Sequence, residues 1–450
     1  MLKLIYYQYI FRKSEWLGAF PVLTVAGIVA GTCFTILFNI LANTEVFIQE
    51  IPVPLFVAPI FFSGLTLFFL ISILIKLLLN IFKKEYRIWY ILGANRWQLS
   101  ILIGGQFTIV ALISSFIGSI LSILPAKGYY TLIQGRVGEK YFPSIPIHFS
   151  FLAVVFTMIT LTVVCFISAL YNVYILLDEN YFTDDDRIQN KISKVRKNFI
   201  FGINLFLWLS LIIGSIMVPY LDLPGGIKYK LSFMSSAIFY LLVIHIFFVK
   251  HLSPWIELKI LRILFSNGRN FATIISRWNV IEKKNFLSSV TISMVTAITL
   301  ITGLLLISNN GIRSGAEQSK EMYISFLFYL ASPLFIIVSN IISVTIIISR
   351  QEKSINSILE IIGGSNTQII KIKLFESIIY SVIVFIISLL LNAIISLLVV
   401  NIANYTDLLI FDAKYSLLPA LIVSLILCIT IFFTKIIIVF YNCRKSGRVI

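Results

Sequence analysis

Hydrophobic residues along this chain gather in long unbroken runs, and the period-two alternation of a half-buried strand is absent from them. Most of the runs reach the length of about 20 residues that a helix needs to cross a hydrocarbon core roughly 30 Å thick. The pattern predicts an all-α polytopic membrane protein with about ten transmembrane helices. The predicted spans lie near 17–41, 55–81, 100–125, 149–176, 199–221, 231–249, 285–308, 324–349, 374–400 and 416–440.

Composition agrees with the membrane class. Hydrophobic residues make up 59% of the 450, charged residues make up 12%, and the mean hydropathy is +0.97. A soluble chain of this size cannot bury so much apolar surface. The net charge of +16 could suggest nucleic acid as a partner. Basic residues at the ends of apolar runs indicate instead contact with anionic lipid headgroups and control of topology.

The distribution of Lys and Arg predicts the orientation. With the N-terminus inside, the cytoplasmic segments hold more than three times as many Lys and Arg as the external segments. We therefore expect both termini in the cytoplasm of a bacterial cell and the spans in its cytoplasmic (inner) membrane. The external segments are short, and the longest, near 126–148, has room for a small folded turn.

The chain contains an internal repeat at an offset of 270 residues. The offset places KKEYRIWYILGANRWQLSILIGGQ (83–106) on KSINSILEIIGGSNTQIIKIKLFE (353–376) without a gap. The offset aligns Gly93 with Gly363 and Gln98 with Gln368, which are identical, and places Gln106 on Glu376. Any two apolar chains align somewhere, so a polar motif at the same phase in both copies is what argues for a repeat.

The repeat predicts the domain organisation. Residues 1–176 form a first four-span repeat, and 271–450 form a second four-span repeat with a short cytoplasmic tail. Residues 177–270 supply cytoplasmic loops and two connecting spans. The two repeats are parallel, because the same orientation follows from the charge bias of both.

Each copy of the motif falls between the second and third span of its repeat, on the predicted cytoplasmic side. The residue pattern predicts a short helix lying along the membrane surface, with Ile88, Ile91 and Leu92 toward the bilayer. Gly93 or Gly363 then ends this helix where the chain turns into the next span.

The first copy resembles the signature of FtsX-like permeases of the MacB type. That signature is a basic pair, Glu, an apolar stretch, Leu-Gly-Ala, then Gln, and a Glu in the next span. The matching residues are Lys83, Lys84, Glu85, Leu92, Gly93, Ala94 and Gln98. The second copy keeps Gly363, Gln368 and Glu376 but lacks the first Glu and the Ala. A span order of 4+2+4 is most similar to peptide-antibiotic permeases of the bacitracin-resistance (BceB) type, although their large extracellular domain is missing here.

The resemblance implies that these segments couple the membrane part to two ABC ATPase subunits, identical or related. The implied coupling residues are Lys83, Lys84, Glu85, Arg87, Leu92, Gly93, Ala94, Gln98, Gly363 and Gln368. The chain has no GxxxxGK[ST] loop, so ATP and Mg are expected on the partner ATPase and no cofactor on this chain. It also has no spacing typical of catalytic or metal-binding residues, so it is expected not to be an enzyme.

Two further features are candidates for gating or structural roles. Gly27 and Gly31 are four residues apart in the first span, a spacing that permits close helix packing. Glu376 lies near the start of the ninth span, where a carboxylate is costly unless it is solvated or paired. Lys373, three residues earlier, could pair with it.

These observations favour the permease subunit of an ABC transporter that exports or removes an amphipathic or antimicrobial peptide, or another outer-leaflet substrate, for export or immunity. Two alternatives stay open. One is a non-transporting transducer that relays ATPase movement across the membrane to a partner. The other is a secondary carrier, which usually has more intramembrane ionisable groups than this sequence shows.

Overall fold

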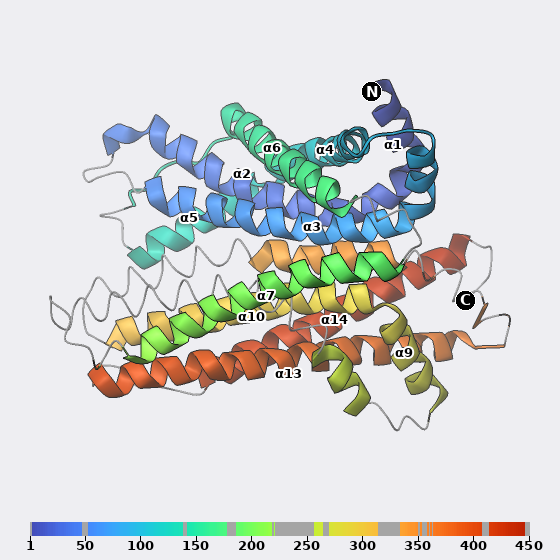
Figure 1. Cartoon of the computed structure of the whole chain (residues 1–450). Coiled ribbons are helices and arrows are strands. Elements are labelled where there is room, and N and C mark those ends of the chain that lie inside the picture. The colour runs from blue at the N-terminus through green and yellow to red at the C-terminus, as the bar shows by residue number, and fades with distance from the viewer. Residues whose placement is uncertain are drawn as a thin grey trace. The chain divides into compact units, whose positions relative to one another are not determined.

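The computed structural model describes the following residues: 2–46, 53–137, 142–177, 186–217, 220, 256–263, 270–313, 334–349, 352, 358–359, 361, 363–406 and 414–445. Over these residues the regular secondary structure is helical throughout, with no strand (Figure 1).

Five of the described helices are long and apolar enough to cross a membrane: Leu17–Ala42, Arg96–Leu121, Phe151–Tyr174, Thr367–Leu397 and Leu417–Phe440. Four shorter apolar helices, Pro59–Phe68, Phe201–Gly214, Phe286–Thr299 and Leu334–Ser349, coincide with other predicted spans. The predicted span at 231–249 lies outside the described residues. The chain is thus a helical protein with several helices suited to a membrane.

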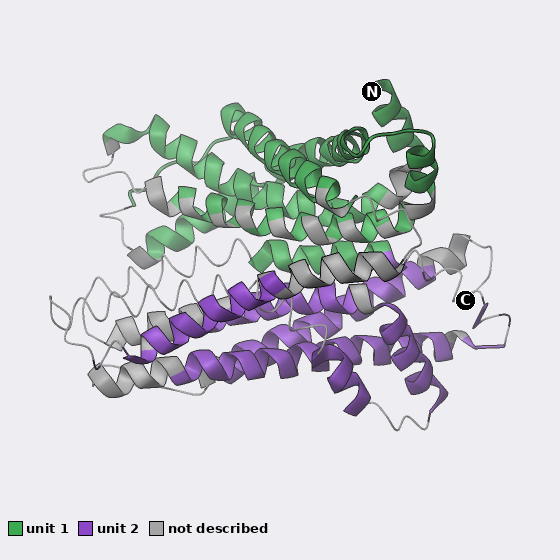
Figure 2. Ribbon diagram, viewed as in Figure 1, with its two compact units in different colours: residues 1–185, 324–347 green, residues 186–323, 348–450 purple. Residues whose placement is uncertain are grey.

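The chain divides into two compact units, shown in separate colours in Figure 2. Unit 1 consists of residues 1–185 and 324–347, and unit 2 of residues 186–323 and 348–450. Unit 1 contains α1 (Leu2–Trp16), α2 (Phe20–Ala42), α3 (Val53–Ile91), α4 (Arg96–Leu121), α5 (Ile123–Val137) and α6 (Phe151–Leu176). It also contains most of the short apolar helix Leu334–Ser349.

Helix α4 forms the centre of unit 1, because it packs against both α2 and α6. Small residues allow α2 and α4 to approach closely. A Cβ atom added at Gly118 would lie 2.5 Å from the Thr24 carbonyl oxygen, and one added at Gly27 would lie 3.1 Å from the Ser115 Cα. At Gly31 it would meet the Ser122 Oγ at 2.8 Å. The close packing predicted from Gly27 and Gly31 is confirmed.

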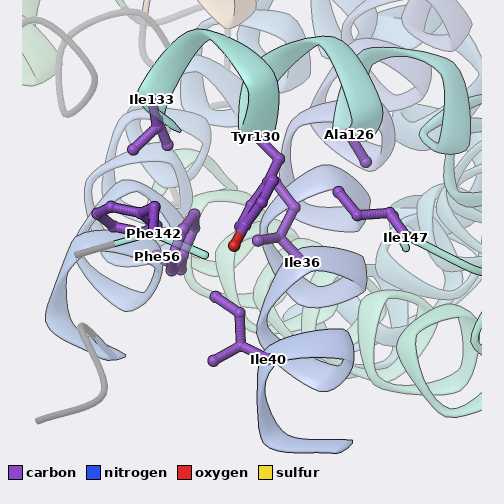
Figure 3. Packing of buried hydrophobic residues seen from close by; sticks show 8 residues of the cluster. All are labelled: Ile36, Ile40, Phe56, Ala126, Tyr130, Ile133, Phe142 and Ile147. Atoms are coloured by element: carbon purple, nitrogen blue, oxygen red, sulfur yellow. The ribbon is translucent and has the colours of Figure 1, made fainter. Parts of the chain in front are cut away.

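A small apolar cap covers the ends of α2 and α3 in unit 1 (Figure 3). Tyr130 and its neighbours on α5 face Ile36 and Ile40 of α2, with Phe56 and Phe142 beside them. The cap cluster consists of Ile36, Ile40, Phe56, Ala126, Tyr130, Ile133, Phe142 and Ile147. The described parts of the segment predicted near 126–148, residues 126–137 and 142–148, therefore share an apolar core with α2 and α3.

Polar bonds hold this cap in place. The Tyr130 hydroxyl donates to the Pro143 carbonyl at 2.6 Å. Asn39 of α2 donates from Nδ2 to the His148 carbonyl at 2.9 Å and accepts from the His148 N–H at 3.0 Å. One asparagine thus satisfies both backbone groups of His148.

Unit 2 is built around a single long helix, α13. Its described helices include α7 (Asp186–Met217), α9 (Phe271–Glu282), α10 (Lys284–Arg313), α13 (Asn366–Thr406) and α14 (Lys414–Lys445). Helix α13 packs against α9, α10 and α14, and α10 also packs against α14.

Helix α3 differs from the sequence-based expectation. It runs without a break for 39 residues from Val53 to Ile91, so residues 83–91 continue the second predicted span. The expected separate surface helix was wrong. At 1.5 Å per residue α3 is about 58 Å long, well beyond the roughly 30 Å of a hydrocarbon core. The helix is therefore longer than such a layer is thick.

Candidate functional site

Gly93 ends α3 in a left-handed turn. Its φ is +93°, a region that favours glycine, and the helix stops two residues earlier at Ile91. The Ala94 N–H donates to the Trp89 carbonyl at 3.0 Å, a bond between residues five apart that is typical of a helix end of the Schellman type. The break predicted at Gly93 is confirmed.

Gly363 has the same local geometry. Its φ is +98°, and the Gly364 N–H donates to the Leu359 carbonyl at 2.9 Å. The two residues of this bond lie 270 positions after Ala94 and Trp89, which form the equivalent bond at the first turn. Within the described residues, Gly93 and Gly363 are also the two glycines with positive φ.

A capping box follows each turn. The Asn95 N–H donates to Gln98 Oε1 at 3.0 Å, and α4 begins at Arg96. The Ser365 N–H donates to Gln368 Oε1 at 3.1 Å, and α13 begins at Asn366. In each case the glutamine satisfies a backbone donor that the first turn of a helix leaves without a partner. Gln98 and Gln368, which the repeat aligns, therefore cap their helices in the same way.

Apolar side chains at both turns face outward. Leu92 is 78% exposed and Ile361 is 84% exposed. Ile88, Ile91 and Ile358 are also exposed. Of the basic and acidic residues predicted here, Glu85 and Arg87 are half-buried, and the side chains of Lys83 and Lys84 lie outside the description. Each turn therefore presents exposed apolar side chains at its tip.

A buried ionic cluster is the second notable feature, and it lies in unit 2. Glu376 of α13 accepts from Lys435 of α14 through Oε2 and from Lys373 at 3.5 Å through Oε1. Asn279 of α9 donates to the same Oε1 at 2.7 Å. The predicted pairing of Glu376 with Lys373 is confirmed, and Lys435 and Asn279 join it.

Glu352 completes the ionic cluster. Its Oε1 accepts from Lys283 at 2.5 Å and from Lys435 at 3.0 Å, and its Oε2 accepts from Lys373 at 2.7 Å. Lys373 and Lys435 thus bridge two carboxylates in a closed ring, with Lys283 attached at one side. Lys283 is the edge of the cluster, because its side chain is 12% exposed while the other four are at most 2% exposed.

The ring compensates for the burial of its charges. An unpaired buried carboxylate is strongly destabilised, so each oxygen in the ring must find a donor. Burial raises the pKa of Glu352, but Lys435, Lys373 and Lys283 outweigh that effect and hold the pKa well below its usual range. Glu352 is therefore ionised at neutral pH.

Two aromatic rings line the ionic cluster. The Nζ of Lys435 lies 5.5 Å from the ring centroid of Tyr380 and 5.8 Å from that of Phe286. These rings pack edge to face with centroids 4.9 Å apart. A cation over aromatic faces gains electrostatic stabilisation where water is excluded.

Most of the ionic cluster was missed by reading the sequence. Lys373 and Lys435 lie within the apolar helices Thr367–Leu397 and Leu417–Phe440, and the sequence pattern predicted a partner for Lys373 alone. A signal was present, because Lys435 follows and precedes long apolar runs and a lysine there needs a partner. Glu352 gave no such signal, since it sits among other charged residues.

Metal binding has no support from these groups. Over the described ranges, no three His, Cys, Asp or Glu side chains come close enough together to hold a metal ion. Glu352 and Glu376 are bridged by lysines, which would repel a cation.

No protein-family model matches this chain, and a search of curated proteins finds no match. The two turns and the ionic cluster are therefore the features of this chain that indicate a function.

Proposed function

We propose that this protein is the permease subunit of a bacterial ABC transporter, driven by two separate ATPase subunits that dock at the turns around Gly93 and Gly363. The observation that carries the proposal is the matched pair of turns. Each has a positive-φ glycine, the same backbone bond across it and a glutamine capping box.

A duplicated four-span unit accounts for this match. Each turn leads into a central helix, α4 or α13, that begins at an equivalent residue. Each central helix packs against the short helix that opens its copy, α1 or α9. The side chain at the equivalent buried position also bonds that short helix, because Gln106 donates to Gln8 at 2.9 Å and Glu376 accepts from Asn279.

Two docking points suit two ATPase subunits. An ABC ATPase pair encloses ATP between its members, so the membrane part must offer each member a contact. The exposed Leu92 and Ile361 are apolar tips of the kind that insert into a groove on a partner. ATP and Mg belong to the ATPase chains, and the turns pass their movement into α4 and α13.

The proposed substrate is an amphipathic or antimicrobial peptide, or another molecule of the outer leaflet, that is exported or removed for immunity. The small external cap around Tyr130 agrees with a substrate taken from the membrane rather than captured by a large external domain.

A secondary carrier is the second candidate, and the ionic cluster favours it. Ionisable groups at membrane depth commonly mark ion pathways. The lysines and carboxylates of the cluster are mutually paired, however, which suits a structural or gating role as well. Transport that persists without any ATPase would support the carrier.

Purification from the native host tests the proposal directly. The expected complex contains one copy of this chain and two ATPase subunits, as determined by its mass in detergent. Leu92→Asp should release ATPase from the complex at moderate salt, because it places a charge in the docking groove. Leu124→Asp on α5 is the matched control, since Leu124 is 77% exposed against 78% for Leu92. Two permease chains per ATPase pair, or equal effects of both variants, would overturn the proposal.

A further inference from the structure

The two halves of the molecule differ most at the ionic cluster. At an offset of 270 residues, the positions in unit 1 that correspond to the ring are uncharged. Phe82 stands for Glu352, Ile103 for Lys373, Gln106 for Glu376 and Cys165 for Lys435. All four are buried and three of them are apolar, so unit 1 has a largely apolar joint where unit 2 has ions.

Aromatic packing holds the joint of unit 1. The Trp16 ring stacks on Phe82 with centroids 6.2 Å apart and meets Phe107 edge to face at 6.0 Å. Phe82 lies within the continuous helix α3, nine residues before Ile91. The Gly93 turn is therefore carried on an unbroken helix that is fixed by ring contacts.

The ionic cluster holds the second turn in another way. The pair between Glu352 and Lys373, 2.7 Å long, joins two residues that are 21 apart in the sequence. Gly363 lies between them. Lys373 is in the second turn of α13, which starts at Asn366, so the ion pair closes the base of the segment that carries the Gly363 turn.

We propose that the ionic cluster is a releasable clamp on the Gly363 turn, and that the Gly93 turn has no such clamp. Ions separate with less penalty than an apolar joint once water reaches them, because opened charges regain hydration whereas opened aromatic surface does not. The partly exposed Lys283 gives water an entry at the edge of the ring.

The clamp makes the two turns unequal. If the proposed function holds, an ATPase subunit at the Gly363 turn opens the ring and frees α13 from α14, while a subunit at the Gly93 turn moves α3 as a rigid body. Opening would separate Lys435 on α14 from Glu352 and Glu376, since these are the contacts that join the helices through charge.

Hydrogen exchange on the purified chain, with no ATPase present, tests the clamp. Glu352→Gln should speed amide exchange across 358–365 at least about tenfold and leave exchange across 89–95 unchanged. A tenfold change corresponds to about 1.4 kcal/mol, close to the loss of one charge-assisted hydrogen bond. A second variant transplants the residues of unit 1 and carries Glu352→Phe, Lys373→Ile, Glu376→Gln and Lys435→Cys. It should keep exchange across 358–365 at or below the wild-type rate, because an apolar joint does not release.

Two outcomes would overturn the clamp: unchanged exchange at 358–365 in Glu352→Gln, or equal changes at both turns. The matched control is Gln106→Leu, which alters the equivalent buried position of unit 1 and should leave 358–365 unaffected. The transplant also separates this inference from the proposed function. A transplant that binds ATPase but no longer transports supports both, whereas failure of the wild-type chain to bind any ATPase removes the proposed function and leaves the exchange result intact.

Discussion

Lys435 of α14 donates a hydrogen bond to Glu376 of α13, and both side chains are fully buried although 59 residues separate them in the sequence. The bond joins two helices that are suited to crossing a membrane. Removing either partner leaves the other charge in a place that water does not reach. The stability of unit 2 therefore depends on the two residues together.

Lys435→Met should destabilise the protein by about 3–5 kcal/mol, the usual result of leaving one partner of a buried ion pair without compensation. The double variant Glu376→Gln with Lys435→Met should lose less than the sum of the two single variants, because the residues interact directly. Thermal unfolding in detergent, followed by size-exclusion chromatography, measures these differences. Lys371→Met is the control, since Lys371 is an exposed lysine on α13, the helix that carries Glu376. Additive losses would contradict the pairing.

Acid should weaken unit 2 through Glu352. Lysines hold the pKa of this carboxyl well below its usual value of about 4.3, so the native state binds fewer protons than the unfolded chain near that pH. The stabilisation is complete above the usual pKa and is lost as the pH falls through the lowered one. Unfolding scans between about pH 6 and pH 3 should show a steeper loss in wild type than in Glu352→Gln. Parallel curves would count against the shift.

Gly93→Val and Gly363→Val should each cost about 1–3 kcal/mol through backbone strain, because both glycines have positive φ. Crowding is no part of the effect, since a Cβ atom at either position would meet nothing within 4 Å. Protection of the first turns of α4 and α13 in hydrogen exchange gives the measurement. Asn tolerates this backbone conformation, so Gly93→Asn should behave much more like wild type. Equal losses in the Val and Asn variants would disprove the explanation.

Gly118→Ala should destabilise unit 1 by about 1–3 kcal/mol through overpacking between α2 and α4. The added methyl would press on backbone, 2.5 Å from the Thr24 carbonyl oxygen and 2.9 Å from the Gly27 Cα, and backbone cannot move aside as a side chain can. Gly128→Ala is the control, because nothing lies within 4 Å of that position on α5. A melting temperature of Gly118→Ala at or above that of Gly128→Ala would refute the close contact.

Asn39→Ala should loosen the cap around Tyr130, because it leaves the His148 N–H and carbonyl without their partner at a cost of about 1–3 kcal/mol. Limited proteolysis should then cut the segment 142–150 faster than in wild type. Asn43→Ala is the comparison. Among the hydrogen bonds described, the Asn43 side chain donates to the Asn39 carbonyl and makes no bond to His148. No gain in cleavage for Asn39→Ala would rule out this role.

Local features of the fold could be predicted from the sequence because they depend on residues close together in the chain. Gly93 and Gly363 mark helix ends through their own backbone freedom, and Gln98 and Gln368 cap the helices that follow within three residues. Apolar runs predicted the long helices for the same reason. The interfacial helix at 83–91 was predicted wrongly, since the basic residues there look like a membrane boundary while the backbone continues as helix.

Contacts between distant residues could not be predicted in this way. The spacing of three residues predicted the pair of Lys373 with Glu376. The contacts of Glu352 and Lys435 require the three-dimensional packing around α13 and α14, and no local pattern predicts them. A charge that is hydrated at the surface needs no particular partner, whereas a charge buried inside a helical bundle is strongly destabilising unless a specific partner compensates it.

Because α3 is one continuous helix, a tilt at one end moves the other end with it. A helix of 39 residues is about 58 Å long, and roughly 28 Å of it exceeds the thickness of a hydrocarbon core. Tilting such a rod by about 10° within the membrane displaces its tip by roughly 5 Å, about the pitch of one helical turn. A small change in the tilt of α3 would thus displace Leu92, next to its end, by several ångströms. Conversely, a force applied at Leu92 would tilt the helix by a small angle.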